Sequence, residues 1–196
     1  MNPMRVLYFA VAGLLVGAGI GVGLKMANQQ DPAEIASPAT PTTQLAEYVP
    51  AFSYPDLENN QRHGSEWQAK ILVLNFWAAW CPPCREETPD FVELQDEYID
   101  DNVKFVGIAI DDPEPVQEFV DTYGVNYPVL LGDIQAVSLS RELGNRFEGL
   151  PFTVVAEPGG KIILRHAGGL SREQLEPVLR DAIKKSRRTH EQVARI

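Results

Sequence analysis

The sequence predicts an α/β fold, in which helices flank a sheet of buried strands and a separate N-terminal segment precedes the domain. Two runs, 71–77 and 103–111, are almost continuously apolar, as in strands that are buried on both faces of a sheet. A segment with helical spacing follows each run, which favours parallel pairing through crossover helices. The 196 residues, of which 44% are hydrophobic, are enough for one domain with a sizeable core.

The N-terminal segment differs from the rest of the chain in its composition. Met1 to Arg5 is short and basic, and Val6 to Leu24 is uncharged and mostly apolar. As a helix this run is about 29 Å long, close to the roughly 30 Å of a bilayer's hydrocarbon core. A cleaved signal peptide is the alternative, but its apolar region is usually shorter and no small-x-small cleavage site follows Leu24. We therefore expect residues 1–26 to be a signal-anchor helix with Arg5 on the cytoplasmic side.

A flexible linker is expected between this anchor and the domain. Residues 27–44 combine prolines with Ala, Ser, Thr and Gln and have no apolar period. The domain is then expected over residues 45–184, with a C-terminal tail at 185–196. Its first part, 48–57, has prolines at its margins and suggests an edge strand or hairpin.

Both cysteines of the chain stand directly after the first apolar run, in Cys81-Pro82-Pro83-Cys84. A helix is expected to begin here, with Glu86 and Glu87 in a first turn where the helix dipole favours negative charge. Residues with helical spacing follow at Phe91, Leu94, Gln95 and Tyr98. The cysteine pair is therefore placed at a strand-to-helix junction.

That placement favours redox chemistry. A thiolate at a helix N-terminus is stabilised by unpaired backbone N–H groups and by the positive end of the dipole. We expect Cys81, nearer the open end, to be the attacking sulfur, and Cys84, about one turn inward, to close the disulfide and release the product. Pro82 and Pro83 have no N–H group and stiffen the turn between the cysteines.

Two other uses of the pair are weaker. A zinc site needs further Cys or His ligands to complete a tetrahedral shell, and no second pair exists in the sequence. A purely structural disulfide that closes a four-residue loop adds little stability, because disulfide stabilisation grows with loop length.

The remaining elements continue the alternation. We expect a helix at 114–123, a strand at 127–131, a helix at 134–143, and an antiparallel hairpin of strands 152–155 and 161–166 around a Pro-Gly-Gly turn. Ser171 and Gln174 form a candidate capping box for a last helix to about Lys184.

The stretch from Asn75 to Glu87, Asn-Phe-Trp-Ala-Ala-Trp-Cys-Pro-Pro-Cys-Arg-x-Glu, resembles the active-site signature of the thioredoxin superfamily. More narrowly, it resembles the TlpA/ResA-like membrane-anchored thiol-disulfide oxidoreductases. The resemblance covers roughly residues 45–182 and includes Pro89, which matches the proline that kinks the active-site helix. It implies a thioredoxin-like fold with a central mixed β-sheet flanked by helices.

The resemblance also identifies a loop opposite the cysteines. On sequence alone an X-Pro bond is expected to be trans, but Gly149-Leu150-Pro151-Phe152-Thr153 resembles the cis-proline loop of the superfamily. There the backbone of Leu150 would pair with an extended substrate segment. The substrate-docking surface implied in this way comprises Trp77, Trp80, Pro82, Pro83, Leu150 and Pro151.

Glu87 is the third candidate catalytic residue. Asn75 stands where ordinary thioredoxins carry a buried Asp, and the TlpA/ResA-like branch places an acid three residues after the second cysteine instead. Glu87 is one turn from Cys84, so both can share a helix face, and partial burial would raise its pKa enough to act as a base for Cys84. The alternative is a solvated Glu that only favours the dipole, as we assume for Glu86.

These observations predict a thiol-disulfide oxidoreductase, single-pass in the bacterial inner membrane, with its domain in the periplasm. No cofactor or metal is expected besides the Cys81–Cys84 redox disulfide, and a net charge of −10 argues against nucleic acid as a partner. The expected direction is reduction of a disulfide-containing protein. By resemblance, apocytochrome c is a client, in cytochrome c maturation, and a transmembrane thiol carrier is the electron donor.

Two rival functions use the same motif. A dithiol oxidase would use the same residues at a higher potential. A thioredoxin-fold copper chaperone would bind metal rather than turn over, but it usually needs a third ligand. None of the three histidines, His63, His166 and His190, is near the motif in the sequence.

Overall fold

The computed structural model describes residues 45–193 of the chain. The expected signal-anchor (1–26) and linker (27–44) lie outside the described residues. Within residues 45–193, no helix is both long enough and apolar enough to cross a membrane.

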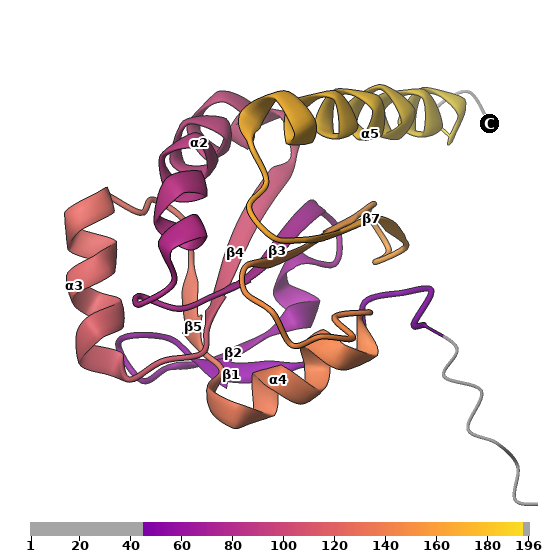
Figure 1. Cartoon of the computed structure of the whole chain (residues 1–196). Coiled ribbons are helices and arrows are strands. Elements are labelled where there is room, and N and C mark those ends of the chain that lie inside the picture. The colour runs from indigo at the N-terminus through magenta and orange to yellow at the C-terminus, as the bar shows by residue number, and fades with distance from the viewer. Residues whose placement is uncertain (1–44, 194–196) are drawn as a thin grey trace, which may run out of the picture. The chain divides into compact units, whose positions relative to one another are not determined.

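A five-stranded mixed sheet forms the centre of the domain, in the order β5-β4-β3-β6-β7 (Figure 1). β3, β4 and β5 run parallel to one another, whereas β6 is antiparallel to β3 and β7 is antiparallel to β6. The strands are β3 (Ile71–Trp77), β4 (Val103–Ala109), β5 (Val129–Leu131), β6 (Phe152–Ala156) and β7 (Ile162–Ala167). The predicted mixed sheet is confirmed, including its parallel half and its C-terminal hairpin.

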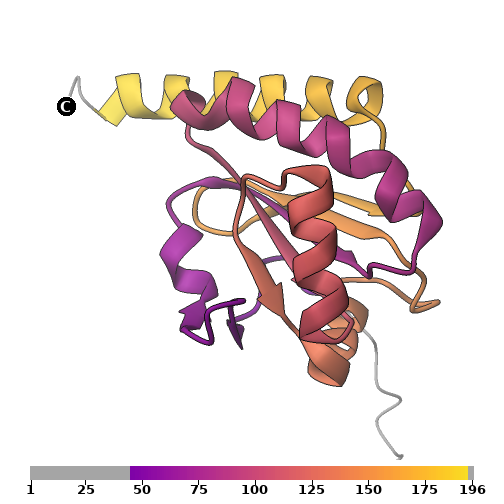
Figure 2. The same cartoon turned by 90° about the vertical axis from the view of Figure 1, so that its left-hand side faces the viewer.

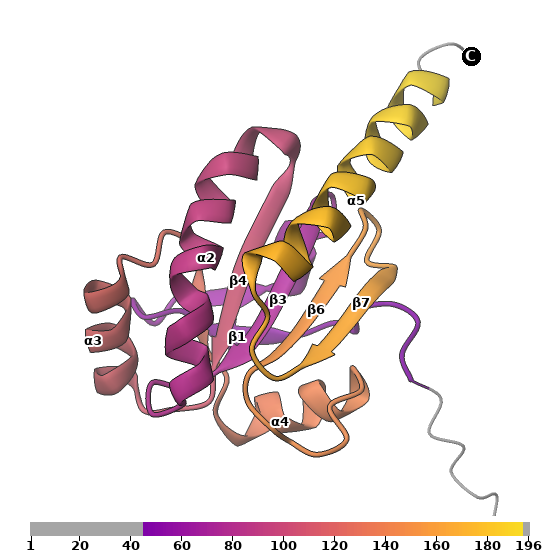
Figure 3. The same cartoon turned by 45° about the horizontal axis from the view of Figure 1, so that its top comes forward.

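Helices cover both faces of this sheet. One face carries α2 (Pro82–Tyr98), α3 (Pro113–Tyr123) and α5 (Arg172–Val193), and Figures 2 and 3 show α2 and α5 side by side over the strands. The other face carries α4 (Asp133–Glu142), the 3-10 turn η1 (Gly64–Trp67) and the hairpin of β1 (Ser53–Pro55) and β2 (Gln61–His63). A short turn, η2 (Ile99–Asp101), leads from α2 to β4. The edge strand or hairpin expected at 48–57 is found in part, because β1 lies within those residues while its partner β2 follows them, and the two form a separate two-stranded sheet.

The central strand β3 is buried along its whole length. Its side chains alternate between the two faces: Ile71, Val73 and Trp77 belong to the core under α2, α3 and α5, and Leu72, Leu74 and Phe76 to the core over α4 and the hairpin. This alternation is the period of two of a β-strand, and burial on both sides explains the continuous apolar run. Asn75 occupies the position between Val73 and Trp77 and therefore shares the face of β3 that meets α2.

Most expected elements are within two residues of their predicted bounds, but the C-terminus is not. The last helix was expected to end near Lys184, whereas α5 continues to Val193, so 185–193 is helical rather than a tail. Two ion pairs support the extra turns: Lys185 Nζ lies 2.6 Å from Glu157 Oε1, and Arg187 pairs with Asp101. Residues expected to form a tail therefore continue the helix and make ion pairs with residues far away in the sequence.

Candidate active site

Cys81 and Cys84 form a disulfide at the N-terminus of α2. Cys81 is the N-cap residue and Cys84 the third residue of the helix, with their Cα atoms 5.3 Å apart. Pro82 and Pro83 occupy the first two helical positions, where their missing N–H groups have no intrahelical partner to lose. Of the first three helical residues, only Cys84 therefore has a backbone N–H group that can stabilise a thiolate.

Exposure does not separate the two cysteines in this oxidised form. Cys81 is 2% exposed and Cys84 is 1% exposed, although Cys81 was expected to be the more open of the two. Their positions along the helix do differ, because Cys81 lies outside the helical turns and Cys84 lies within the first. The order of attack assigned to them rests on this difference in position.

The loop before β6 lies at the same edge of the sheet as the disulfide. Phe152 pairs with Phe76, so the next residues along each strand, Pro151 and Trp77, lie at the edge from which the chain continues to Cys81. The Leu150–Pro151 peptide bond is cis, which confirms the expectation drawn from the resemblance. The N–H group of Gly168 donates a 2.8 Å hydrogen bond to the Pro151 carbonyl and connects the start of β6 to the end of β7.

The expected docking surface is only partly exposed. Trp80 is 64% exposed, Pro82 is exposed, and Pro83 and Leu150 are half-buried. Pro151 is buried.

Trp77 was expected on this docking surface, but this assignment was wrong. Its side chain is 3% exposed, and its ring centroid lies 4.3 Å from that of Phe119 on α3. The strand period directs Trp77 toward the helical face of the sheet, where it packs into the core. Its position next to the motif in sequence does not bring it to the surface.

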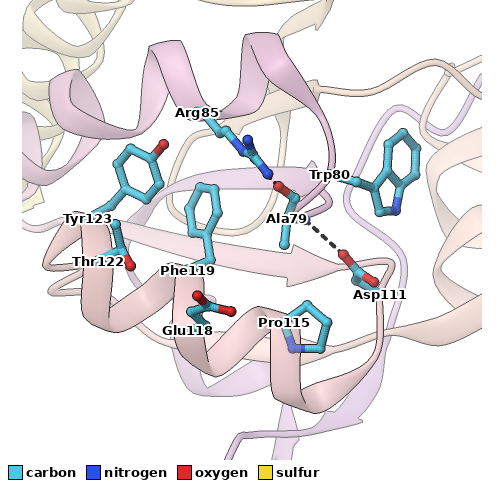
Figure 4. Close-up of a pocket in the computed structure, with 9 residues that line it drawn as sticks. All are labelled: Ala79, Trp80, Arg85, Asp111, Pro115, Glu118, Phe119, Thr122 and Tyr123. Atoms are coloured by element: carbon cyan, nitrogen blue, oxygen red, sulfur yellow. Dashed lines mark hydrogen bonds between the residues drawn. The ribbon is translucent and has the colours of Figure 1, made fainter.

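A groove of about 400 Å³ lies between α3 and the residues that flank the cysteine pair, Ala79 and Trp80 before it and Arg85 after it (Figure 4). At one end, Asp111 Oδ2 accepts a hydrogen bond of 2.9 Å from the backbone N–H of Ala79, and Arg85 Nε donates one of 2.8 Å to the Ala79 carbonyl. Both backbone groups of Ala79 are thus held by side chains, which fixes the loop that presents Trp80. No role was assigned to Asp111 from the sequence, and Arg85 was named only as a letter of the signature. The sequence did offer one signal for Asp111, since it ends the apolar run 103–111, and that run contains β4, the strand next to the one that leads to the cysteines.

Glu87 is buried, with 4% of its side chain exposed. Asn75 Nδ2 donates to Glu87 Oε1 at 2.8 Å, and the backbone N–H of Leu170 donates to Glu87 Oε2 at 2.8 Å. Burial raises the pKa of Glu87 from 4.5 to about 7, although both of these hydrogen bonds act in the opposite direction. A carboxyl group in this range can exchange a proton at neutral pH.

The helix position of Glu87 corrects one expectation. The helix begins at Pro82, so Glu86 and Glu87 lie in its second turn, and the first turn contains no acidic residue. The dipole account of these residues was therefore wrong, because the effect is confined to the first turn. The two neighbours differ in burial, since Glu86 is exposed and Glu87 faces the core.

The described residues contain no group of three or more His, Cys, Asp or Glu side chains that could hold a metal ion. Of the histidines, His63 lies on β2 and His166 on the outer strand β7. What residues 45–193 bring together at the motif is a disulfide and a buried carboxyl group.

Comparison with known proteins identifies the same chemistry. The Redoxin family model matches residues 44–183. The thiol-disulfide oxidoreductase ResA of Halalkalibacterium halodurans is 32% identical over 126 residues, which cover 64% of this chain and 69% of that protein. ResA of Bacillus thuringiensis is 26% identical, with 92% of this chain and 98% of that protein covered. A thiol:disulfide interchange protein structure from Chlorobium tepidum TLS superposes with a TM-score of 0.64 at 26% identity, over 69% of this chain and 95% of that one.

Proposed function

Because the chain belongs to the Redoxin family and is a thiol-disulfide oxidoreductase of the ResA type, we propose that it reduces disulfides of periplasmic proteins. The observation that carries the proposal is the Glu87 carboxyl group, buried one turn behind Cys84 with a pKa of about 7. A base in this position suits the release step of a dithiol reductant, in which the inner cysteine must lose its proton.

The reaction begins from the dithiol form. The Cys81 thiolate attacks one sulfur of the client disulfide, which breaks the client S–S bond and leaves a mixed disulfide and a client thiolate. Cys84 then loses its proton to Glu87 and attacks the Cys81 sulfur. The second client thiolate leaves, and Cys81–Cys84 is the disulfide that forms. Two electrons pass to the client, whose thiolates are protonated from the solvent.

Client binding would use the exposed part of the site. An extended client segment pairs with the backbone at Leu150 by strand addition and brings its disulfide over Cys81. Trp80, Pro82 and Pro83 supply apolar contact at the rim of the site. Cys81 is buried, so the client must approach closely along this loop to bring its disulfide to the Cys81 thiolate.

We propose the chain's location from its N-terminal sequence, its electron donor from the compartment, and its client from the resemblance to the TlpA/ResA-like proteins. The apolar run Val6 to Leu24 would anchor the chain in the inner membrane, and residues 27–44 would tether the domain on the periplasmic side. A reductant in an oxidising compartment must be recharged, so a transmembrane thiol carrier would return electrons to Cys81–Cys84. Apocytochrome c is the client proposed, because its cysteine pair must be reduced before haem attachment.

The reduction potential of the Cys81–Cys84 couple tests the direction of this reaction. The full chain is equilibrated with defined thiol buffers, and the oxidised fraction is measured. A potential near thioredoxin's, about −270 mV, or lower supports the reductase. A potential near DsbA's, about −120 mV, would reverse the direction and make the protein a dithiol oxidase.

A further inference from the structure

Asn75 is the only polar residue in the central strand β3, and it is 4% exposed. Its Nδ2 group donates two hydrogen bonds, at 2.8 Å to Glu87 Oε1 and at 3.0 Å to Thr153 Oγ1. A primary amide has two N–H donors, and both have acceptors here. The amide group is therefore held in one orientation, between α2 on one side and β6 on the other.

The second acceptor lies in the strand that follows the cis-proline loop. Asn75 and Thr153 are directly opposite each other in the β3–β6 register, and Thr153 is two residues after Pro151. The Thr153 side chain is fully buried. The amide thus connects the strand that begins at the docking loop to the helix that carries the cysteines.

Neutral donors surround the Glu87 carboxyl group. One oxygen accepts from Asn75 and the other from the backbone N–H of Leu170, in the loop before α5. Hydrogen bonds to the charged form favour ionisation, and burial opposes it. The donors therefore make ionisation of this buried acid attainable at neutral pH.

In the part of the chain that the structure describes, the ionisation of Glu87 is affected by its own burial, the Leu170 N–H group and the Asn75 amide, none of which is a positive charge. The side chain of Arg172, at the start of α5, pairs instead with Glu93, Glu97 and Glu176. Buried Tyr127, before β5, interacts with Glu87, and both its own burial and that carboxyl group raise the pKa of its phenol. On α2, Glu86 and Asp90 line with Glu87 a small cavity of about 200 Å³, which Gln174 of α5 also borders, and Cys84 lies one turn before Glu87. Among the described residues, the side-chain donor to the carboxyl group is Asn75.

We propose that Asn75 is a positioning residue that favours the ionised form of Glu87. One N–H of its amide group donates to the Glu87 carboxyl group, and the Thr153 hydroxyl group accepts from the second N–H and holds the amide in this orientation. The inference deepens the proposed function, since it concerns the base assigned to Cys84. A neutral donor is suited to this place because it stabilises the charged carboxylate. A second carboxyl group there would repel it.

Isotope-edited infrared spectroscopy measures the titration directly. The full chain, oxidised and labelled with ¹³C-glutamate, is titrated, and the Glu87 band is identified by its loss in Glu87→Gln. A hydrogen bond to a charged group changes an ionisation equilibrium by a factor of about 10 to 100, so Asn75→Leu should raise the midpoint by about one to two pH units. An unmoved midpoint in Asn75→Leu would overturn the proposal.

Two further variants keep the test decisive. Thr153→Val leaves the Asn75–Glu87 donor in place, so its midpoint should move upward by less than in Asn75→Leu. Asn75→Asp preserves the side-chain shape, and the two carboxyl groups should titrate in two steps, one of them above the wild-type midpoint. If Asn75→Leu does not fold, Asn75→Asp decides, and a single step at the wild-type midpoint would refute the assignment.

The measurement is independent of catalysis. It uses the oxidised chain without a client, so it reports how Asn75 acts on Glu87 whether or not Glu87 serves Cys84. The pH profile of mixed-disulfide resolution supplies the second readout. A midpoint that moves while the resolution profile stays in place supports the positioning role and removes Glu87 from the proposed mechanism.

Discussion

Replacement of Glu87 by Gln should remove a pH dependence of the protein's stability. The pKa of Glu87 is about 7 in the folded protein, against an ordinary value of 4.5. Between these two values the folded chain binds more protons than the unfolded chain, so the free energy of unfolding decreases as the pH rises. This destabilising contribution of Glu87 to the free energy of unfolding is absent below about pH 4.5 and reaches its full size above about pH 7.

The size of the effect follows from the difference between the two values. Each pH unit corresponds to about 1.4 kcal/mol, so the ionisation of Glu87 lowers the free energy of unfolding by about 3 kcal/mol at pH 8. The side chain is 4% exposed, so solvent screening reduces this figure little. Gln cannot ionise, but its NH2 group cannot accept the hydrogen bond that one of the Glu87 oxygens accepts, which lowers the stability of the variant by a constant amount at every pH. The free energy of unfolding of Glu87→Gln, taken relative to the wild type, should therefore rise by about 3 kcal/mol between pH 4 and pH 8.

Denaturant unfolding of the oxidised full chain, followed by tryptophan fluorescence from pH 4 to 8, measures this difference. The matched control is Glu86→Gln, because Glu86 is the exposed neighbour of Glu87 on the same helix. This variant should keep the free energy of unfolding within about 0.5 kcal/mol of wild type across the pH range. Because all variants share the other carboxyl groups, the contribution of those groups to the pH dependence cancels when the variants are compared. Parallel stability profiles for the wild type and Glu87→Gln would refute the raised pKa and, with it, the base assigned to Cys84.

Four further substitutions test the site. Cys84→Ser should accumulate a mixed disulfide with a client peptide, visible by mass spectrometry, whereas Cys81→Ser should not; the reverse pattern would exchange the roles of the two sulfurs. Trp80→Ala should weaken client binding several-fold and change the free energy of unfolding by less than about 0.5 kcal/mol, since the side chain is 64% exposed. Unchanged client kinetics would remove Trp80 from the docking surface. Asp111→Ala should lower the free energy of unfolding by about 1–3 kcal/mol, because it leaves the part-buried N–H of Ala79 without its acceptor. A stability equal to wild type would indicate that water replaces this hydrogen bond.

Local sequence patterns predicted the strands and the position of the cysteine pair well. The continuous apolar run at 71–77 predicts a strand buried on both faces, and β3 has those bounds. The motif after it was expected at a strand-to-helix junction, where Cys81 caps α2. Both features depend on neighbours in the sequence, so patterning can identify them.

The errors arise where local and tertiary effects compete. Trp77 was assigned to the docking surface through the family resemblance, but the pleat of β3 directs it to the core against Phe119. Glu87 was placed in the first helical turn, whereas the helix begins early enough to put it in the second. The C-terminal residues 185–193 continue α5, which ion pairs with distant turns hold in place.

The sequence by itself determined the α/β class, the order of strands and helices, and the presence of a single redox-capable cysteine pair at a helix start. These properties follow from hydrophobic period, turn residues and spacing, which act over a few residues. Only the tertiary structure decided which partners Glu87 has, because Asn75 is 12 residues away in sequence and Leu170 is 83 residues away. Contacts of that range depend on sheet register and on how a distant loop packs over the active-site helix. The raised pKa of Glu87 is a consequence of that packing.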